Sequence, residues 1–389
     1  MSRVLFVVLA EKGHVHPFIA PAQELARRGH QVGFYAPCDL RGPLARAGIR
    51  DVFVGGSEPV EDAGRGPAFA ALVRDAERLR RWISALLIDS VPLEVSRLTA
   101  VVDGFRPQVI VADPMAYAAP IVATRAGLPW AGVSTSLNAL VPDGWRSELI
   151  ATTSALPRAE LFAKYGLPGA SFRVSDCLSP HLNVAWTTPE LVGAAPPGVL
   201  LAGASLPQVA RGDESDVLGP EPDPARPLVF MALGSQIYHQ PRMFEIVIEA
   251  SRGQAWQLVL AMGELAGKAA LPAHVRAMAY APQLAALARA RAMISHGGAN
   301  SVMEALAHGV PLLVSPICND QPHNARFVAA AGAGHICDLS RATPDEVRAT
   351  LATLCADGPA RAAAGRIADS YRLAGGAIRV AAAIEDLLR

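Results

Sequence analysis

Short apolar runs alternate along the chain with longer segments of helical spacing. Buried strands are predicted at 4–9, 31–36, 108–112 and 130–133, and helices at 17–28, 70–84, 91–102 and 116–126. The pattern begins again after residue 227, with strands at 228–233, 257–262, 277–280, 292–295 and 312–315 and an amphipathic helix at 378–388. Strands that alternate with helices predict βαβ units, and therefore parallel sheets covered by helices on both faces.

A polar segment separates the two series. Residues 206–226 are rich in Pro, Gly, Asp and Glu, a composition that buries little surface and is typical of a linker. We therefore predict an N-terminal domain over 1–205, a linker over 206–226, a C-terminal domain over 227–372 and a helix over 373–389 that returns towards the first domain. Because doubly wound sheets bind ligands beyond the carboxyl ends of their strands, the cleft between the domains is the expected site.

Composition excludes several classes of function. Of the 389 residues 51% are hydrophobic and the formal net charge is zero, so we expect sizeable cores and neither nucleic acid nor an anionic membrane as the main partner. The five cysteines show no C-x-x-C spacing and fit a reducing cytoplasm better than a disulfide framework or a zinc site. The apolar run 4–10 is too short for a signal peptide, and no run reaches the length of a membrane span. We expect a cytoplasmic protein without stable membrane insertion; its oligomeric state stays open.

A dense group of polar residues follows the predicted strand 292–295. The glycine pair 297–298 permits a sharp turn with close backbone approach, and helical spacing resumes directly after it. The first N–H groups of a helix lack partners within the helix, and the helix dipole favours negative charge there. With His296, Asn300 and Ser301 beside this helix start, the segment predicts a phosphate site. The alternative is an ordinary strand–turn–helix connection.

A second group of candidates lies at strand ends of the first domain. His14 follows the first predicted strand and precedes a predicted helix. A helix start disfavours a protonated ring, so we expect a neutral imidazole that can act as a general base. Asp113 ends the strand 108–112 and can orient such a base and stabilise its charge. The alternatives are a packing or capping role for His14 and a helix-capping role for Asp113.

The segment 280–321 resembles the nucleotide-sugar signature of the UDP-glycosyltransferase superfamily. The spacing from His296 through Glu304 to the pair Asp320 and Gln321 matches the family pattern without a gap. The resemblance implies an α/β protein of the GT-B class, with two facing doubly wound Rossmann-like domains and a cleft between them. It implies transfer of a sugar from a UDP- or TDP-sugar to a hydroxyl of a small apolar natural product. Inversion at the sugar carbon and independence of metals and other cofactors are part of the same expectation.

The resemblance also assigns roles to individual residues. The segment from Gly13 to Pro17 resembles the family's acceptor-activating loop, so His14 is the expected catalytic base and Asp113 its partner. His16 stands where many relatives carry Asn and is the alternative base. The residues implied in donor binding are Ser235, Tyr280, Ala281, Gln283, His296, Gly298, Asn300, Ser301, Glu304, Asp320 and Gln321.

Particular contacts to the donor follow from these assignments. Tyr280 is expected to stack on the base and Gln283 to hydrogen-bond the nucleoside, while Asp320 and Gln321 read sugar hydroxyls. Glu304 lies one turn into the helix, where its carboxylate can accept from both ribose hydroxyls. That arrangement favours UDP over the deoxyribose of TDP, although related enzymes that use TDP-sugars also keep a glutamate.

Two other functions stay open at this point. A glycosyltransferase acting on a lipid or cell-wall carrier would carry a basic and apolar surface on its first domain, and residues 78–82 form one such patch. A catalytically inactive, sugar-nucleotide-binding auxiliary protein would keep the fold, but the presence of both His14 and Asp113 argues against it. Trp82 and Trp145 lie in irregular segments that would face an acceptor or fill the core. The acceptor itself cannot be named from the pattern.

Overall fold

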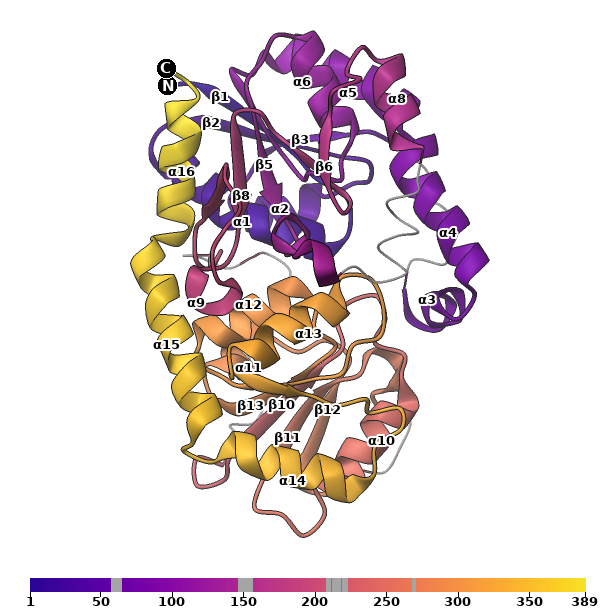
Figure 1. Cartoon of the computed structure of the whole chain (residues 1–389), viewed down its shortest axis with the longest axis vertical. Helices are drawn as coiled ribbons and strands as arrows, with labels where there is room; N and C mark the ends of the chain where they lie inside the picture. Colours follow the sequence, from indigo (N-terminus) through magenta and orange to yellow (C-terminus); the bar gives the residue numbers. More distant parts are fainter. Residues whose placement is uncertain (57–64, 146–156, 208–210, 212–217, 219–222, 268–270) are drawn as a thin grey trace.

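The computed structural model describes residues 1–56, 65–145, 157–207, 211, 218, 223–267 and 271–389. Within these residues the chain forms two parallel sheets, one above the other in Figure 1, each covered by helices. The first has seven strands in the order β3-β2-β1-β4-β5-β8-β9, and the second has six in the order β12-β11-β10-β13-β14-β15. Both orders reverse beside the first strand of their series, as doubly wound sheets do.

The first domain contains the N-terminal sheet, its helices and a short hairpin. Its strands are β1 (Arg3–Val7), β2 (Gln31–Ala36), β3 (Asp51–Val54), β4 (Val109–Ala112), β5 (Trp130–Ser134), β8 (Leu182–Ala185) and β9 (Val199–Leu201), with the antiparallel pair β6 (Ser171–Arg173) and β7 (Asp176–Leu178). Its helices are α1 (Lys12–Arg27), α2 (Arg41–Arg46), α3 (Gly66–Val73), α4 (Ala76–Ser84), η2 (Ala85–Asp89), α5 (Val91–Phe105), α6 (Ala118–Arg125), η3 (Asn138–Leu140), η4 (Asp143–Trp145), α8 (Arg158–Lys164) and α9 (Pro189–Val192).

The second domain repeats this plan. Its strands are β10 (Leu228–Ala232), β11 (Gln257–Ala261), β12 (Val275–Met278), β13 (Ala290–Ser295), β14 (Leu312–Val314) and β15 (Gly334–Ile336). Its helices are α10 (Pro241–Ala250), η5 (Gly263–Leu265), α11 (Gln283–Leu287), α12 (Ala299–Ala307), α13 (Gln321–Ala330), α14 (Pro344–Cys355), α15 (Pro359–Ala374) and α16 (Gly376–Asp386).

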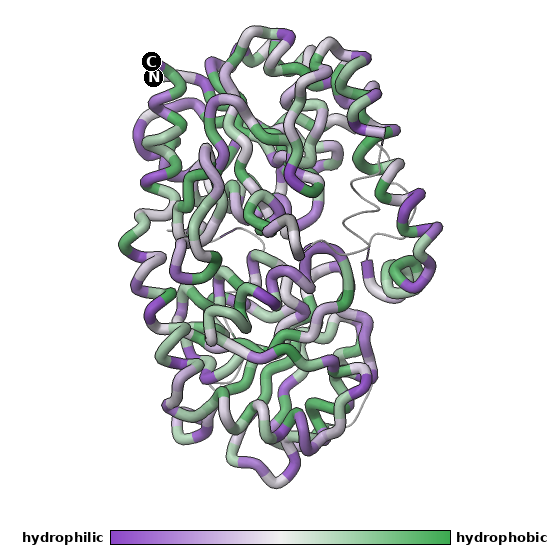
Figure 2. Tube along the Cα trace, in the orientation of Figure 1, coloured by the Kyte–Doolittle hydropathy of each residue, from purple (hydrophilic) through white to green (hydrophobic). Residues whose placement is uncertain are grey.

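Apolar strands form the centre of both domains. Every residue of β4 and β10 is buried, because helices cover both faces of each sheet. Figure 2 shows hydrophobic residues gathered along the strands and hydrophilic residues spread over the outer helices and loops. In the described part of the chain, we find no helix with the length and apolar character needed to span a membrane.

Two predicted helices differ from the observed ones. The helix predicted at 70–84 is two helices, α3 and α4, with Asp75 between them. The side chain of Asp75 caps α4 by accepting from the backbone amides of Glu77 and Arg78 at 3.1 Å. The helix predicted at 17–28 begins at Lys12, so His14 lies in its first turn. Pro17 is therefore inside the helix rather than at its start, which frees a backbone carbonyl.

The two prolines within α1 create contacts with the rest of the molecule. Proline has no N–H, so Pro17 and Pro21 leave the carbonyls four residues earlier without their helical partners. Both carbonyls are bound from outside the helix. Asn300 Nδ2 at the start of α12 donates to Gly13 O at 2.7 Å, and Ser205 Oγ donates to Pro17 O at 2.8 Å. These bonds attach α1 to the second domain and to the start of the interdomain connection.

The C-terminal helices run along both domains (Figure 1). Helix α15 ends at Gly375, whose φ of 88° turns the chain, and α16 then packs against α1. Arg28 Nη1 at the end of α1 donates to Glu385 Oε2 at 2.6 Å. The helix predicted at 373–389 therefore starts at Gly376, while 373–374 belong to α15. The predicted linker 206–226 lies largely outside the described residues.

Candidate active site

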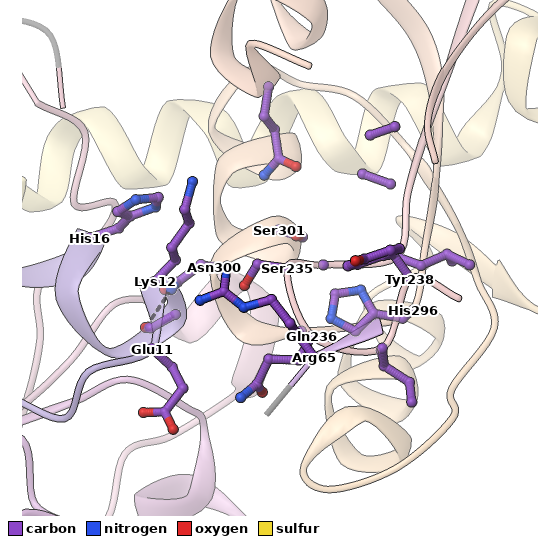
Figure 3. Close-up of a pocket in the computed structure, with 18 of the residues that line it drawn as sticks. Glu11, Lys12, His16, Arg65, Ser235, Gln236, Tyr238, His296, Asn300 and Ser301 are labelled. Atoms are coloured by element: carbon purple, nitrogen blue, oxygen red, sulfur yellow. Dashed lines mark hydrogen bonds between the residues drawn. The ribbon is translucent and has the colours of Figure 1, made fainter. Parts of the chain in front are cut away.

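A cavity of about 360 Å³ lies between the two domains, beside the carboxyl ends of β1, β10 and β13. Figure 3 shows Glu11, Lys12 and His16 on one side of it, with Asn300, Ser301 and His296 on elements of the second domain. Its lining contains the following sequence-predicted residues: His14, Ser235, Tyr280, Ala281, Gln283, His296, Gly298, Asn300, Ser301, Glu304, Asp320 and Gln321. The structure thus brings these residues, separated by up to three hundred positions, to one place.

The strand-end Asp113 and the helix-start His14 are in direct contact. His14 Nδ1 lies 2.5 Å from Asp113 Oδ2, and the carboxylate is completely buried behind it. Asp113 Oδ1 accepts from the backbone amide of Met115 at 2.9 Å, which fixes the carboxylate plane. Thr135 Oγ1, just beyond β5, is 3.0 Å from His14 Nδ1 and 3.3 Å from Asp113 Oδ2. With Nδ1 held on this side, Nε2 is the ring nitrogen that can take a proton from an acceptor.

The expectation that the helix start keeps His14 neutral is wrong. Burial disfavours the charged ring and lowers the pKa of His14, but the Asp113 carboxylate, aided by Glu11 and Asp320, raises it to about 9. A full charge in contact with the ring outweighs a helix dipole, which amounts to roughly half a charge at the N-terminus. The raised pKa favours the protonated ring of His14 at neutral pH, and only the neutral fraction of His14 can act as a base.

His16 has a different environment from His14. Its Nδ1 lies 3.2 Å from Nη1 of Arg211, a residue of the predicted linker. Because a guanidinium only donates hydrogen bonds, His16 Nδ1 must accept, which places the ring proton on Nε2. His14 is the histidine in contact with the strand-end carboxylate, so the geometry favours His14 over His16 as the base.

The start of α12 provides the arrangement expected for a diphosphate. Gly298 precedes the helix, and a Cβ there would come within 2.6 Å of His296 Nε2. A Cβ on Gly234 (φ 78°) would come within 2.8 Å of the same atom, so glycines border the imidazole from two segments. Burial lowers the pKa of His296 to about 4, against a weaker opposing effect of the Ala232 backbone. His296 is therefore neutral near pH 7 and can offer a phosphate a hydrogen bond, not a charge.

Several of the residues predicted to bind the donor make contacts within the protein. The amide nitrogen of Asn300 donates to Gly13 O, so this side chain links the start of α12 to the first turn of α1, which carries His14. Tyr280 is 41% exposed, and Lys12 Nζ lies 3.8 Å from its ring centroid, on the ring expected to stack with a base. Ala281 is buried next to it.

Glu304 is the clearest departure from expectation. It is buried, Oε1 accepts from Arg211 Nη1 at 2.6 Å, and Oε2 accepts from Gln283 Nε2 at 2.6 Å. About half of the acceptor positions of the carboxylate are therefore already used within the protein, and two ribose hydroxyls would need all of the rest. Gln283, expected to bind the nucleoside, also uses one N–H on Glu304.

Asp320 and Gln321 have different surroundings although they are neighbours. Burial raises the pKa of Asp320, and its charge acts on His14 across the cleft. Gln321 Oε1 accepts from two backbone amides of its own loop at 2.9 Å each. Asp320 thus faces the reaction centre, whereas Gln321 shapes the loop, and its Nε2 also donates to Cys318 Sγ at 3.5 Å.

The structure adds residues that the sequence analysis did not select. Thr135 follows the predicted strand 130–133 in a Ser-Thr-Ser run, which is the same strand-end position that singled out Asp113. Arg211 gave no signal, because an isolated arginine in a polar linker is ordinary. Trp145 does not face the cavity but packs on Phe327 of α13, with ring centroids 4.9 Å apart.

A second cavity, of about 310 Å³, is lined mainly by the first domain and lies next to the interdomain one. The two share the lining residues Glu11, Lys12, Arg65, Ser235 and Gln236. Apolar residues in its lining include Val7, Val8, Leu9, Ala10, Tyr35, Pro37, Trp82, Leu86, Leu87, Val91, Met115, Ala116, Tyr117 and Ala118. An apolar molecule held there would have one end near the loop that carries His14.

Comparisons with known proteins show which family the chain is similar to. Residues 256–387 match the family model of the C-terminal domain of erythromycin biosynthesis protein CIII-like proteins. L-demethylnoviosyl transferase of Streptomyces niveus is 30% identical over 94% of this chain and 93% of its own length. Demethyllactenocin mycarosyltransferase of Streptomyces fradiae is 26% identical over 100% of this chain and 87% of its own.

Solved structures share the same architecture. The glycosyltransferase of kitacinnamycin superposes with a TM-score of 0.82 at 24% identity, covering 100% of this chain and 99% of that one. Glycosyltransferase VinC, solved in complex with dTDP, superposes with a TM-score of 0.73 at 22% identity, covering 99% of each chain. The predicted α/β fold of the GT-B class, with two facing Rossmann-like domains and a cleft between them, is confirmed. The chain belongs to the UDP-glycosyltransferase superfamily, among the glycosyltransferases of natural-product biosynthesis.

Proposed function

We propose that this protein is an inverting, metal-independent glycosyltransferase that moves a sugar from a UDP- or TDP-sugar to a hydroxyl of a small apolar natural product. One observation carries the proposal. His14 of the first domain, backed by the buried Asp113, lines the same cavity as the α12 start of the second. A base and an anion site that face each other across one cavity are what a displacement at a sugar carbon requires.

The reaction is a single displacement. Neutral His14 accepts the acceptor's hydroxyl proton at Nε2 while the oxygen attacks the anomeric carbon. The bond between that carbon and the diphosphate oxygen breaks, and its electron pair leaves with the nucleoside diphosphate. Attack opposite the leaving group inverts the configuration. Asp113, in contact with His14 Nδ1, stabilises the imidazolium that forms.

The second domain would stabilise the departing diphosphate. The unpaired N–H groups of the first turn of α12, its dipole, the Ser235 hydroxyl and neutral His296 all line the cavity where negative charge develops. These groups supply the positive potential that a divalent cation provides in other transferases. We therefore propose that no metal takes part.

The apolar cavity of the first domain is the proposed acceptor site. Its position next to the start of α1, where His14 lies, would bring one end of an acceptor to the base. Two relatives are named as transferases of mycarosyl and demethylnoviosyl groups, which supports sugar transfer in antibiotic biosynthesis. The dTDP bound to VinC supports a nucleoside diphosphate at the second domain.

The test is an assay of wild type with UDP- and TDP-sugars against a panel of apolar hydroxylated compounds. Product mass reports transfer, and the anomeric coupling constant reports configuration. We expect an inverted glycoside, and His14→Ala to lower turnover by roughly two to four orders of magnitude with nucleotide binding retained. His16→Ala is the matched variant; a near-normal His14→Ala beside an inactive His16→Ala would move the base to His16. Nucleotide binding without transfer or donor hydrolysis would contradict the enzymatic assignment.

A further inference from the structure

An ion pair occupies the position expected for the donor's ribose. Arg211 Nη1 and Glu304 Oε1 are 2.6 Å apart, and their side chains are only 4% and 3% exposed. Gln283 Nε2 donates to the other carboxylate oxygen at 2.6 Å. All three residues line the cavity between the domains, as does Tyr280. The protein thus brings its own charged donor to the group that a ribose would use.

Arg211 is anchored on both sides of the cleft. It belongs to the predicted linker, and besides Glu304 on α12 it contacts His16 Nδ1 on α1 at 3.2 Å. Figure 3 shows His16 on the side of the cavity opposite Ser301, the neighbour of Glu304 along α12. A buried arginine held by two elements of different domains keeps its place more firmly than a solvent-exposed one, because leaving Glu304 would strand a buried charge.

The ion pair changes what Glu304 offers to a sugar. A carboxylate has about four acceptor positions, and two of these are taken. Hydrogen bonds to a charged group are stronger than those between neutral groups. The guanidinium of Arg211 compensates the charge of the Glu304 carboxylate with which it is in contact. A ribose has two hydroxyls and would therefore need two acceptor positions on Glu304 beside those that Arg211 and Gln283 use. A 2′-deoxyribose brings one hydroxyl and needs one position.

We propose that Arg211 is a specificity-determining residue that removes the advantage of the ribose 2′-hydroxyl. The site then accepts 2′-deoxyribonucleoside diphosphates as well as ribonucleoside diphosphates. This reverses the expectation that Glu304 favours UDP. The inference rests on the proposed function, since it concerns the nucleotide part of that donor.

The test compares UDP with 2′-deoxy-UDP, which differ in this hydroxyl alone, by calorimetric titration. In wild type the two dissociation constants should agree within about threefold, because the 2′-hydroxyl gains little from an ion-paired carboxylate. Arg211→Gln frees Oε1 and removes the positive charge that faces Glu304, so UDP should then bind about tenfold more tightly than 2′-deoxy-UDP. Arg276→Gln is the matched control. Arg276 Nη1 holds the linker at Leu218 O (2.9 Å) away from the cavity, so its loss should leave the ratio unchanged.

Each other outcome contradicts the inference. A wild type that prefers UDP tenfold overturns it without any variant, so the test stands even where Arg211→Gln fails to fold. Equal weakening of both nucleotides in Arg211→Gln would make Arg211 a phosphate ligand instead. If the protein transfers a sugar and still gives one of these two results, the role of Arg211 is overturned and the proposed function is not. A wild type that binds neither nucleotide removes the donor site, and the proposed function with it.

Discussion

Asn300 Nδ2 donates to Gly13 O at 2.7 Å and so joins the start of α12 to the residue before His14. The carbonyl is available because Pro17, four residues on, has no N–H to bind it. A side chain that the sequence predicts to bind the donor therefore also positions the first turn of α1, which carries the base. This contact couples the two halves of the site.

Asn300→Ala should lower kcat by about two- to tenfold, the effect of losing one hydrogen bond of about 0.5–1.5 kcal/mol. Nucleotide affinity should change little, since the contact is to Gly13. Steady-state kinetics and nucleotide titration measure the two effects. Ser205→Ala is the control, because it removes the equivalent bond to Pro17 O, away from His14, and should leave kcat near wild type. An Asn300→Ala protein with normal kcat and weak nucleotide binding would make Asn300 a donor ligand only.

Gly298→Ala should weaken UDP or TDP binding by about ten- to a hundredfold. The added methyl would lie 2.6 Å from His296 Nε2, so the imidazole must leave its position and lose its bond to the diphosphate. The backbone is not strained, because φ at this residue is −59°. Gly358 precedes α15 in a similar way, but a Cβ there meets nothing within 4 Å. Gly358→Ala should therefore bind nucleotide normally, and equal behaviour of the two variants would argue against a phosphate site at His296.

The sequence predicted the two domains and most of the central strands, because buried parallel strands are continuous apolar runs. It placed Asp113 and the start of α12 correctly for the same reason, since each directly follows such a run. It missed β3, β8 and β9 of the first sheet and β15 of the second. β15 has three residues, two of them exposed, and therefore no apolar pattern. It also missed the state of Glu304 and the charge of His14. Both depend on partners, Arg211 and Asp113, whose distance in space cannot be deduced from spacing along the chain.

Leu86→Trp should raise the KM for the acceptor by about tenfold, equivalent to about 1.4 kcal/mol of lost binding. Leu86 lines the apolar cavity, and an indole there would occupy space that the acceptor needs. Nucleotide binding should be unchanged. Leu93→Trp introduces the same group at a position that is 50% exposed and should have no effect. An unchanged acceptor KM in Leu86→Trp would place the acceptor elsewhere.

Activity should persist in excess EDTA, with no gain on adding magnesium. The proposed reason is that the α12 start, Ser235 and His296 provide the positive potential at the leaving group. Initial rates before and after chelation, with a magnesium-dependent transferase as a positive control, decide the matter. A rate that falls with EDTA and returns with magnesium would contradict this picture.

The dependence of kcat/KM on pH tests the central claim most directly. The Asp113 carboxylate raises the pKa of His14 from 6.5 to about 9, so the neutral, basic form should grow as the pH rises. In wild type, log kcat/KM should therefore increase with pH and level off near pH 9. Asp113→Asn removes the main cause of the raised pKa of His14, while burial still lowers that pKa. The rising part of the pH profile should therefore move below pH 6.5, and kcat/KM at the plateau should drop. A wild-type profile that is flat between pH 6.5 and 9, or a limb that Asp113→Asn leaves in place, would contradict His14 as the base.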